Sequence, residues 1–432
     1  MAEVHLRCLG GCREVGRSAF LLDVNGKKLL IDYGISLNET PSFPLHVRAI
    51  DVDVVVISHA HLDHSGSVPM LYTSKIKPYT VSTALSAVVL RYLLADMLKL
   101  SGYYLPFEVH EVREMYESMT LVDNDEVVDV GDVQVRFIHA GHVPGSSMIL
   151  ISCEGFKALY TGDINLVESQ LLYPADKQQI LRECPIDLLI IESTYGDRAH
   201  EPRKIVEEKF VQAVMEVVEG GGVVLIPAFA YGRAQEIMCV LYKYLRDAVE
   251  VYVDGMAKAL SRELLDYHMY LKDFKLYKEA LKKVRFVKRA EQRAEILKKK
   301  GVVVISPAGM LRGGPSTYYA SILADREDSA IFLVSYQIPG TPGHSLLNYG
   351  KLDVNRDENV RCRVEWFDFS SHLGQPDLIN FISSIVKSSD GLTDVLLVHG
   401  EESSCNTLAS LLKDQGISAK VPLNGETLHY KK

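Results

Sequence analysis

The sequence lacks the features that mark several classes of protein. Its longest apolar run, Val223 to Tyr231, is far shorter than the roughly 20 residues that a membrane-spanning helix needs, so we expect no membrane partner. Met1 to Gly10 holds no basic stretch followed by an apolar core, which argues against a secretory signal. Apolar residues make up 47% and charged residues 24% of the chain, an ordinary globular composition. We therefore expect a soluble, cytoplasmic protein.

Paired cysteines are also lacking. The seven cysteines are scattered and odd in number, and no two of them form a C-x-x-C pair. This pattern argues against a disulfide framework and a zinc ribbon, and it is typical of inert, buried thiols. At 432 residues the chain exceeds one typical core, so two domains are expected. No Gly-, Pro- or Ser-rich linker marks the boundary between them.

Acidic residues outnumber basic ones over the whole chain, but basic residues are concentrated in one segment. The net charge is −9, whereas Lys272–Lys300 holds twelve Lys or Arg against four Asp or Glu, an excess of +8 that leaves −17 for the rest. Local potential decides contact with nucleic acid more than total charge does. The segment is either a solvated helix face or a surface that follows a phosphate backbone, and composition alone leaves both open.

Short apolar strands alternate with segments of helical spacing along the chain. Asn25-Gly26 predicts a hairpin between strands at 19–24 and 28–32, and Val52 to Ile57 indicates a strand buried on both faces. Other strands are expected at 133–139, 147–152, 157–161, 188–192, 223–227, 251–253, 302–306, 330–335 and 395–399, helices at 68–72, 85–100, 205–219, 233–246 and 403–415, and a final strand pair around Asn424-Gly425. This order is typical of an α/β protein with layered sheets and helices.

The strongest local signal is a cluster of metal ligands directly after one predicted strand. His59-Ala60-His61-Leu62-Asp63-His64 offers four imidazole or carboxylate groups, and both types suit zinc. The spacing of His59 and His61 directs both side chains toward one ion, which leaves Asp63 and His64 for a second. Two ions about 3.5–4 Å apart form a clamp for in-line displacement at phosphorus.

The remaining ligands must come from distant parts of the chain. His142 lies in a glycine-containing loop, Asp163 follows a strand and is a candidate bridge between the ions, and His399 ends another strand. Taken alone, each is more readily a core or loop residue, but together with the first motif they supply the ligands that two ions still need. Asp32 either stabilises a turn or accepts the second ring N–H of a ligand histidine.

These motifs, in this order, resemble those of the metallo-β-lactamase superfamily. The matches to its four core motifs are Asp32, His59-x-His61-x-Asp63-His64, His142 and Asp163. The matches to motifs A, B and C of its β-CASP nucleases are Glu192, His372 and His399. A histidine in motif C resembles the branch that acts on RNA. The resemblance spans nearly the whole chain and is greatest to archaeal enzymes of the CPSF type, which are related to RNase J.

The resemblance implies a fold and a metal cofactor. The fold would be α/β, a metallo-β-lactamase αββα sandwich built from Met1–Asp197 and Glu365–Lys432, with a β-CASP domain inserted at Arg198–Val364. Two Zn²⁺ ions per chain are implied. The expected ligands are His59, His61 and His142 for one ion, Asp63, His64 and His399 for the other, and Asp163 for both.

The activity implied is that of a ribonuclease in RNA processing or decay. It would cleave as a 5′→3′ exonuclease, an endonuclease or both, and leave a 3′-hydroxyl and a 5′-phosphate. Besides Asp63, the catalytic residues would be His372 and Glu192, with His372 as the acid that protonates the leaving 3′-oxygen. A carboxylate partner such as Glu192 raises a histidine pKa and fixes its tautomer.

RNA is the partner that the resemblance implies, and a homodimer stays open. Candidate contacts to RNA phosphates are Arg312, Gly313, Gly314, Ser370 and Ser371, although the Gly309–Pro315 loop is as readily a tight turn. The alternatives are a small-molecule metallo-hydrolase such as a thioesterase, an inactive scaffold, and a nuclease that acts on DNA. The inserted domain argues against the first, and the full set of ligand residues argues against the second.

Overall fold

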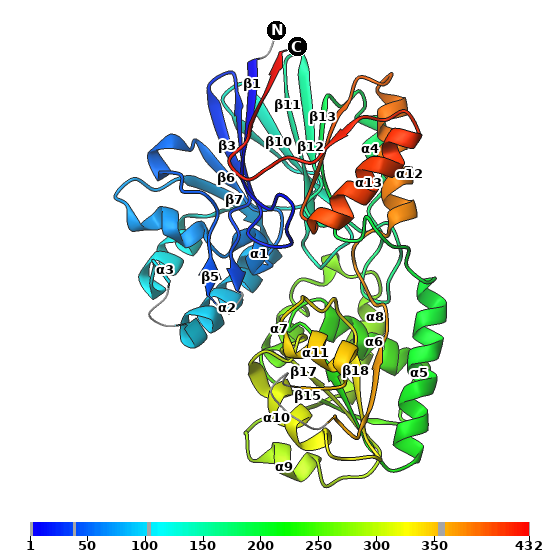
Figure 1. Ribbon diagram of the computed structural model, residues 1–432. Coiled ribbons are helices and arrows are strands. Elements are labelled where there is room, and N and C mark those ends of the chain that lie inside the picture. Colours follow the sequence, from blue (N-terminus) through cyan, green and yellow to red (C-terminus); the bar gives the residue numbers. More distant parts are fainter. Residues whose placement is uncertain (1–2, 38–39, 102–104, 353–358, 432) are drawn as a thin grey trace. The chain divides into compact units, whose positions relative to one another are not determined.

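The computed structural model describes residues 3–37, 40–101, 105–352 and 359–431 (Figure 1). The chain forms two compact units. The first unit comprises Met1–Val167, Pro174–Ala199 and Ser371–Lys432, and the second comprises Glu168–Tyr173 and His200–Ser370. The boundaries expected from the sequence, at 198 and 364, lie near the ends of His200–Ser370, and the edge strand β19 carries the sheet of the second unit on to Trp366.

One sheet of the first unit begins with the N-terminal hairpin. Its strands, in spatial order, are β22 (Thr427–Lys431), β1 (Glu3–Gly10), β2 (Ala19–Val24), β3 (Lys27–Ile31), β6 (Val54–Val56), β7 (Tyr79–Thr83) and β8 (Thr120–Val122). The turn between β2 and β3 has positive φ at both Asn25 and Gly26, as a two-residue hairpin requires. From β3 onward the strands are parallel, so the polar loops that follow β3 and β6 emerge at one edge.

The other sheet of the first unit mixes a meander with parallel strands. Its strands are β21 (Ala419–Lys420), β20 (Asp394–Val398), β13 (Leu188–Glu192), β12 (Phe156–Tyr160), β11 (Ser147–Cys153), β10 (Val133–His139) and β9 (Val127–Val130). Strands β12, β13, β20 and β21 run parallel, and strands β9 to β12 run antiparallel. A two-stranded ribbon, β4 (Ser36–Leu37) with β5 (Pro41–Ser42), stands apart from both sheets.

The two sheets pack face to face and carry helices on their outer faces. Val4, Leu6 and Phe20 of one sheet share a buried apolar cluster with Val135 and Ile149 of the other. The outer face of the second sheet is covered by α4 (Lys177–Arg182), α12 (Gln375–Ser388) and α13 (Glu402–Asp414). Near the first sheet lie α1 (Leu62–Ser65), α2 (Ala84–Ser101), α3 (Val109–Ser118), and the 3₁₀ segments at Ala49–Asp51 and Val68–Thr73. These layers are the expected αββα sandwich.

The second unit is built on an entirely parallel sheet. Its strands, in spatial order, are β16 (Arg285–Phe286), β15 (Glu250–Val253), β17 (Val302–Ser306), β14 (Val223–Pro227), β18 (Ala330–Leu333) and β19 (Arg363–Trp366). Its helices are α5 (Arg203–Glu219), α6 (Arg233–Leu245), α7 (Ala257–Glu263), α8 (Phe274–Lys283), α9 (Gln292–Ile296), α10 (Gly314–Leu323) and α11 (Pro342–Tyr349), with a 3₁₀ turn at His268–Tyr270. The central strands β14 and β17 are buried along their whole length, as parallel strands between helices should be.

Most elements match the pattern expected from the sequence, with two corrections. The strands that flank Asn424-Gly425 do not pair with each other, because β21 joins one sheet of the sandwich and β22 joins the other. The segment 68–72, expected as a helix of ordinary spacing, is a 3₁₀ turn with Pro69 near its start. Five of the seven cysteines are buried and all seven are free, as the scattered pattern predicted.

Candidate metal centre

The predicted ligands lie in loops that follow strands of both sheets in the first unit. The His59–His64 loop follows β6, His142 lies in the loop between β10 and β11, Asp163 follows β12, and His399 follows β20. One ligand and one supporting residue occupy uncommon backbone conformations: His399 has φ of 45° and Asp32 has φ of 56°. Non-glycine residues with positive φ are held there by their surroundings, and they cluster at functional sites.

Four side chains form a first group around one point. His61 Nδ1 lies 3.2 Å from His59 Nε2 and 3.1 Å from His142 Nε2. Asp163 Oδ2 lies 3.5 Å from His59 Nε2 and 3.4 Å from His142 Nε2. Zinc–nitrogen bonds of about 2.0–2.1 Å in a tetrahedron put neighbouring ligand atoms about 3.3 Å apart. Four of the separations among these ligand atoms are therefore close to the value expected around one zinc ion.

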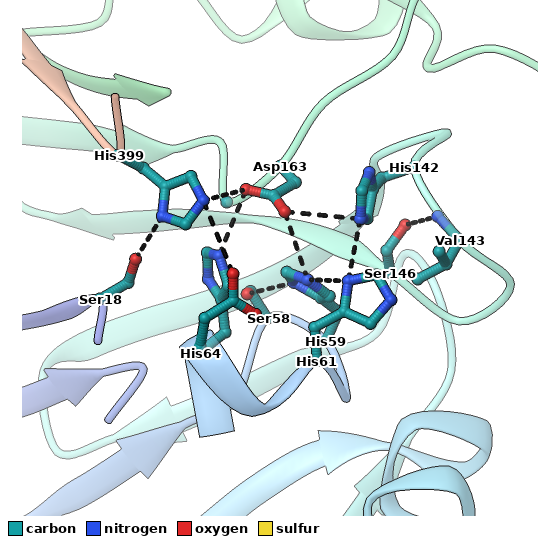
Figure 2. Close-up of polar contacts among 12 residues, drawn as sticks. Ser18, Ser58, His59, His61, His64, His142, Val143, Ser146, Asp163 and His399 are labelled. Atoms are coloured by element: carbon teal, nitrogen blue, oxygen red, sulfur yellow. Dashed lines mark hydrogen bonds and ion pairs between the residues drawn. The ribbon is translucent and has the colours of Figure 1, made fainter. Parts of the chain in front are cut away.

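The second oxygen of Asp163 faces a second group, which contains Asp63, His64 and His399. Oδ1 lies 3.2 Å from His64 Nε2 and 3.7 Å from His399 Nε2, and Asp63 Oδ2 lies 3.8 Å from His399 Nε2. Figure 2 shows Asp163 between His142 and His399, with one oxygen directed toward each side. A single carboxylate thus reaches both groups, as a bridging ligand must.

The outward ring nitrogens of four histidines are each held by a defined partner. His59 Nδ1 lies 3.1 Å from Ser58 Oγ, His142 Nδ1 lies 3.0 Å from the Ser371 carbonyl, and His399 Nδ1 lies 2.7 Å from Ser18 Oγ. The fourth, His64 Nδ1, lies 2.7 Å from Asp32 Oδ2. Such partners orient a ligand imidazole and direct its other nitrogen inward.

Asp32 is buried and is the hub of these contacts. Besides His64 Nδ1, its carboxylate accepts hydrogen bonds from the Ser58 amide and hydroxyl, at 2.8 and 2.7 Å, and from the Tyr160 hydroxyl at 2.8 Å. This arrangement favours the interpretation of Asp32 as the partner of a ligand histidine over that of a residue that only stabilises a turn. It also fixes the His59–His64 loop against β12.

Burial and mutual repulsion set the charge of the ligands. Burial, together with neighbouring His64, holds the pKa of His59 well below its usual range, and burial also lowers the pKa of His61 and His142. Burial disfavours a charged His64, but Asp163 and Asp32 outweigh it and hold the pKa of His64 well above its usual range. Burial likewise disfavours a charged Asp163, yet the imidazoles around it, His64 foremost, keep the pKa of its carboxyl well below its usual range.

The donor set and the unsatisfied atoms fit divalent cations. The two groups together contain five imidazoles and two carboxylates. Imidazole and carboxylate are the ligand types that zinc takes in hydrolytic sites. His64 Nε2 and Asp163 Oδ1 are buried and lie 3.2 Å apart as an ion pair, and neither forms a hydrogen bond within the described part of the chain. Buried polar atoms without partners are costly unless an ion satisfies them. The residues present therefore fit a pair of zinc ions.

His372 and Glu192 form a separate pair beside the first group. His372 Nδ1 lies 2.8 Å from both carboxylate oxygens of Glu192, and its Nε2 lies 3.9 Å from Asp163 Oδ2. Glu192 is itself held by the Thr194 hydroxyl at 2.5 Å and the Ile164 amide at 2.9 Å. Burial lowers the pKa of His372, but Glu192 and Asp163 outweigh this and raise it to about 9. The ring directs Nε2 toward the ligands.

The residues expected to contact RNA are divided between the two units. Ser371 belongs to the first unit, and its carbonyl accepts a hydrogen bond from the His142 ring. Ser370, Arg312, Gly313 and Gly314 belong to the second unit. The Ser370 amide donates to Asp368 Oδ1 at 3.2 Å, which leaves its hydroxyl as the candidate contact to a phosphate. Gly313 and Gly314 begin α10, both with positive φ.

Three supporting residues carry no signal in the sequence. Ser18, Tyr160 and Thr194 touch His399, Asp32 and Glu192, but each stands in an ordinary strand or loop context. Only the fold brings Ser18 beside a residue 381 positions away. The motif around Glu192 contained Thr194, and a threonine two residues after a functional carboxylate was the one available hint.

Comparisons with known proteins agree with this geometry. Family models match the Metallo-beta-lactamase superfamily over residues 12–202, the Beta-Casp domain over 234–346 and the Zn-dependent metallo-hydrolase RNA specificity domain over 357–422. "RNase aCSPSF2" of Saccharolobus solfataricus is 40% identical, over 98% of this chain and 85% of that one. This chain belongs to the metallo-β-lactamase superfamily, in the branch with a β-CASP domain. "Probable RNase MJ4" of Methanocaldococcus jannaschii is 35% identical, over 97% and 98%.

Two further comparisons extend the range of similar proteins. "Transcription termination factor FttA" of Methanothermobacter thermautotrophicus is 31% identical, over 98% of this chain and 71% of that one. A solved structure, "Crystal Structure of a Protein of Unknown Function from Enterococcus faecalis V583", shares the fold with a TM-score of 0.62 at 15% identity, over 99% and 100%. Within the described residues, no helix combines the length and the apolar character that crossing a membrane would need. A homodimer and a cytoplasmic location stay predictions.

Proposed function

We propose that this chain is a two-zinc ribonuclease that hydrolyses RNA phosphodiester bonds to a 3′-hydroxyl and a 5′-phosphate. The observation that carries the proposal is the position of the Asp163 carboxylate, whose Oδ2 lies among the ligand atoms of the first group and whose Oδ1 faces the second group. RNA as the substrate is supported by relatives named as RNases and by the match to a Zn-dependent metallo-hydrolase RNA specificity domain.

The protein residues have separate tasks in this reaction. His59, His61 and His142 would hold one ion, Asp63, His64 and His399 the other, and Asp163 both. Bound zinc ions would lower the pKa of a water and stabilise the charge that develops on the phosphate oxygens. Asp32, Ser18 and the Ser371 carbonyl keep the ligand rings oriented, so that little reorganisation is needed during the reaction.

His372 is the proton donor in this proposal. His372 Nδ1 lies 2.8 Å from both carboxylate oxygens of Glu192 and is engaged there. The proton available for transfer is therefore the one on Nε2. That nitrogen lies on the side of Asp163, next to the first group, where a leaving 3′-oxygen would need a proton. General acid assistance of this kind contributes about 10²–10⁴-fold to a rate. Arg312, Gly313, Gly314, Ser370 and Ser371 remain the candidates for contacts with RNA phosphates.

Digestion of 5′-labelled RNA tests the activity and its mode. We expect a chelator to abolish cleavage and zinc to restore it. Release of mononucleotides from 5′-monophosphate RNA alone would identify an exonuclease, and internal fragments that do not depend on the 5′ end would identify an endonuclease. Hydrolysis of a thioester with no cleavage of RNA would instead support a small-molecule hydrolase, and cleavage of DNA in preference to RNA would also overturn the proposal.

The variant His372→Ala tests the assignment of the acid. We expect it to keep two zinc ions per chain and to lose about 10²-fold or more in kcat, because only the proton donor is removed. The matched control is His110→Ala, which removes an exposed histidine paired with Glu114 on α3. Full activity in His372→Ala, with zinc retained, would remove His372 from the role of the acid.

A further inference from the structure

The parallel sheet of the second unit gathers functional loops at one edge. The strands β14 and β17 pair in register and end together at Pro227 and Ser306, where the Gly309–Pro315 loop follows. From the end of β19 at Trp366 the chain needs only six residues to reach His372. The edge strand β16 runs parallel to these strands, so its carboxyl end, after Phe286, lies at the same edge of the sheet.

A cluster of cations lies at the carboxyl end of β16. We call Lys258, Arg262, Lys288 and Arg289 the basic corner. The Lys258 ammonium donates to the Val287 carbonyl, and the Arg262 guanidinium lies 4.7 Å from the centre of the Phe286 ring. Lys288 and Arg289 follow directly in the chain. The helix α7 and the end of β16, which are separated in the chain by α8, therefore present their positive charges together.

The charges of the basic corner are largely uncompensated. Arg262, Lys288 and Arg289 are exposed, and none of them forms an ion pair with another described residue. The nearest buried acid, Asp254, is 3.8 Å from Lys258 but is already satisfied by Arg293 Nε at 2.7 Å and by the Tyr319 hydroxyl at 3.1 Å. Glu291 is the one exposed acid in the loop that follows. A positive potential results in a chain that is acidic overall.

The basic corner is also held in a fixed conformation. The amides of Lys288 and Arg289 both donate to Gln292 Oε1, at 2.7 and 3.1 Å, and the Gln292 amide donates back to the Arg289 carbonyl at 3.2 Å. Because the backbone is ordered by these bonds, binding there would cost mainly side-chain entropy. A surface that served only solubility would need no such ordering.

We propose that the basic corner binds the phosphate backbone of single-stranded RNA, as a contact separate from the cleavage site. The proposal rests on the ribonuclease function proposed above. Five strand spacings of about 4.8 Å separate β19 from β16, so the sheet edge spans about 24 Å. A strand of RNA that follows this edge from the end of β19 would meet the Gly309–Pro315 loop and then the basic corner. Only RNA long enough to cover that span would gain affinity from the basic corner. The protein should therefore bind RNA of many nucleotides more tightly than RNA of a few.

The chain provides a matched control for this proposal. Lys298 and Lys300 are exposed and form no ion pair with another described residue, just as Lys288 and Arg289 do not. They precede β17, however, and so lie at the amino ends of the strands, the opposite edge of the sheet. Removal of either pair changes the net charge equally, and only one pair lies on the proposed path.

The experiment compares the binding of labelled single-stranded RNA of about 6 and about 30 nucleotides by fluorescence anisotropy, with a chelator present to prevent cleavage. For the longer RNA, Lys288→Gln with Arg289→Gln should weaken binding about 10-fold and reduce the slope of log K against log salt by about 1.4, because two phosphate contacts are lost. Lys298→Gln with Lys300→Gln should change neither quantity. The 6-nucleotide RNA should bind both double variants like the unchanged protein.

Two outcomes would overturn the proposal. Equal weakening by the two double variants would mean that net charge alone is responsible, and unchanged binding of the longer RNA by the first variant would remove the contact. Cleavage assays with zinc keep this result distinct from the proposed function: KM for the longer RNA should rise while kcat stays constant. A protein that binds RNA at the basic corner but hydrolyses none would retain this inference and lose the ribonuclease proposal.

Discussion

The two groups of ligands that share Asp163 differ in how closely their ligand atoms are spaced and in how exposed they are to solvent. In the first group, four separations among the facing atoms of His59, His61, His142 and Asp163 are 3.1–3.5 Å. In the second group, His64 lies 3.2 Å from Asp163, but the distances from His399 to Asp63 and to Asp163 are 3.8 and 3.7 Å, and the Asp63 side chain is 34% exposed. A closely spaced ligand set is typical of tightly held zinc, whereas an open one leaves room for water or substrate. The second group should therefore bind its ion more weakly and lie nearer the entry of the substrate.

Removal of the shared carboxylate should have the largest effect. Asp163→Asn replaces the one charge that both groups use, so we expect zinc content to fall from two ions per chain toward zero and kcat to fall by at least about 10³-fold, the scale of a lost electrostatic stabiliser. Asp63→Asn changes only the exposed member of the second group, and should leave one ion bound. Zinc analysis after gel filtration measures both results. Equal zinc loss in the two variants would contradict the ranking of the groups.

Loss of Asp32 should weaken one group selectively. Asp32 orients His64 of the second group at 2.7 Å and makes no direct contact with His142 of the first. Partners of this kind typically contribute 10–100-fold to metal affinity. In a chelator titration of Asp32→Asn, we expect one ion to leave at a chelator concentration about 10–100-fold lower than in the unchanged protein, while the other leaves at an unchanged concentration.

The control for this variant is Asp53→Asn, since Asp53 is exposed and caps the Lys28 amide far from the ligands. Release of both ions together in Asp32→Asn would show instead that Asp32 supports the whole loop through Ser58.

The sequence predicted which residues form the candidate site better than it predicted how their side chains are oriented. His59, His61, Asp63 and His64 stand in one short motif, so residue type and spacing were enough to find them. His142, Asp163 and His399 come from separate strands, and only their combination with that motif singled them out; the structure brings all seven side chains together. The inward ring nitrogens of three ligand histidines are set by contacts of their other nitrogens with Ser18, Ser58 and Ser371. No spacing rule reveals these contacts.

The fold was predicted where periodicity was strong and missed where pairing was distant. Buried runs such as Leu188–Glu192 and Val223–Pro227 contain only residues that favour strands, and both are strands. The two strands around Asn424-Gly425 looked like a hairpin, because local turn chemistry favours one. They separate because β22 pairs with β1, more than 400 residues away in the sequence, and burial of the sandwich core outweighs the local preference.

The smallest effect should come from Ser18→Ala, which tests whether the open group depends on a single hydroxyl. Ser18 Oγ lies 2.7 Å from His399 Nδ1, and both side chains are buried. A hydrogen bond of about 1 kcal/mol corresponds to about a 5-fold change in affinity, so the weaker zinc site should lose about that factor while the tighter site stays constant. Thr80→Val is the matched control, because it removes a buried hydroxyl bonded to Tyr72, away from the ligands, at a similar cost in stability. Chelator titration with thermal unfolding in parallel separates the two effects: a lower melting temperature without a change in zinc affinity would mean that Ser18 supports the fold and not the ion.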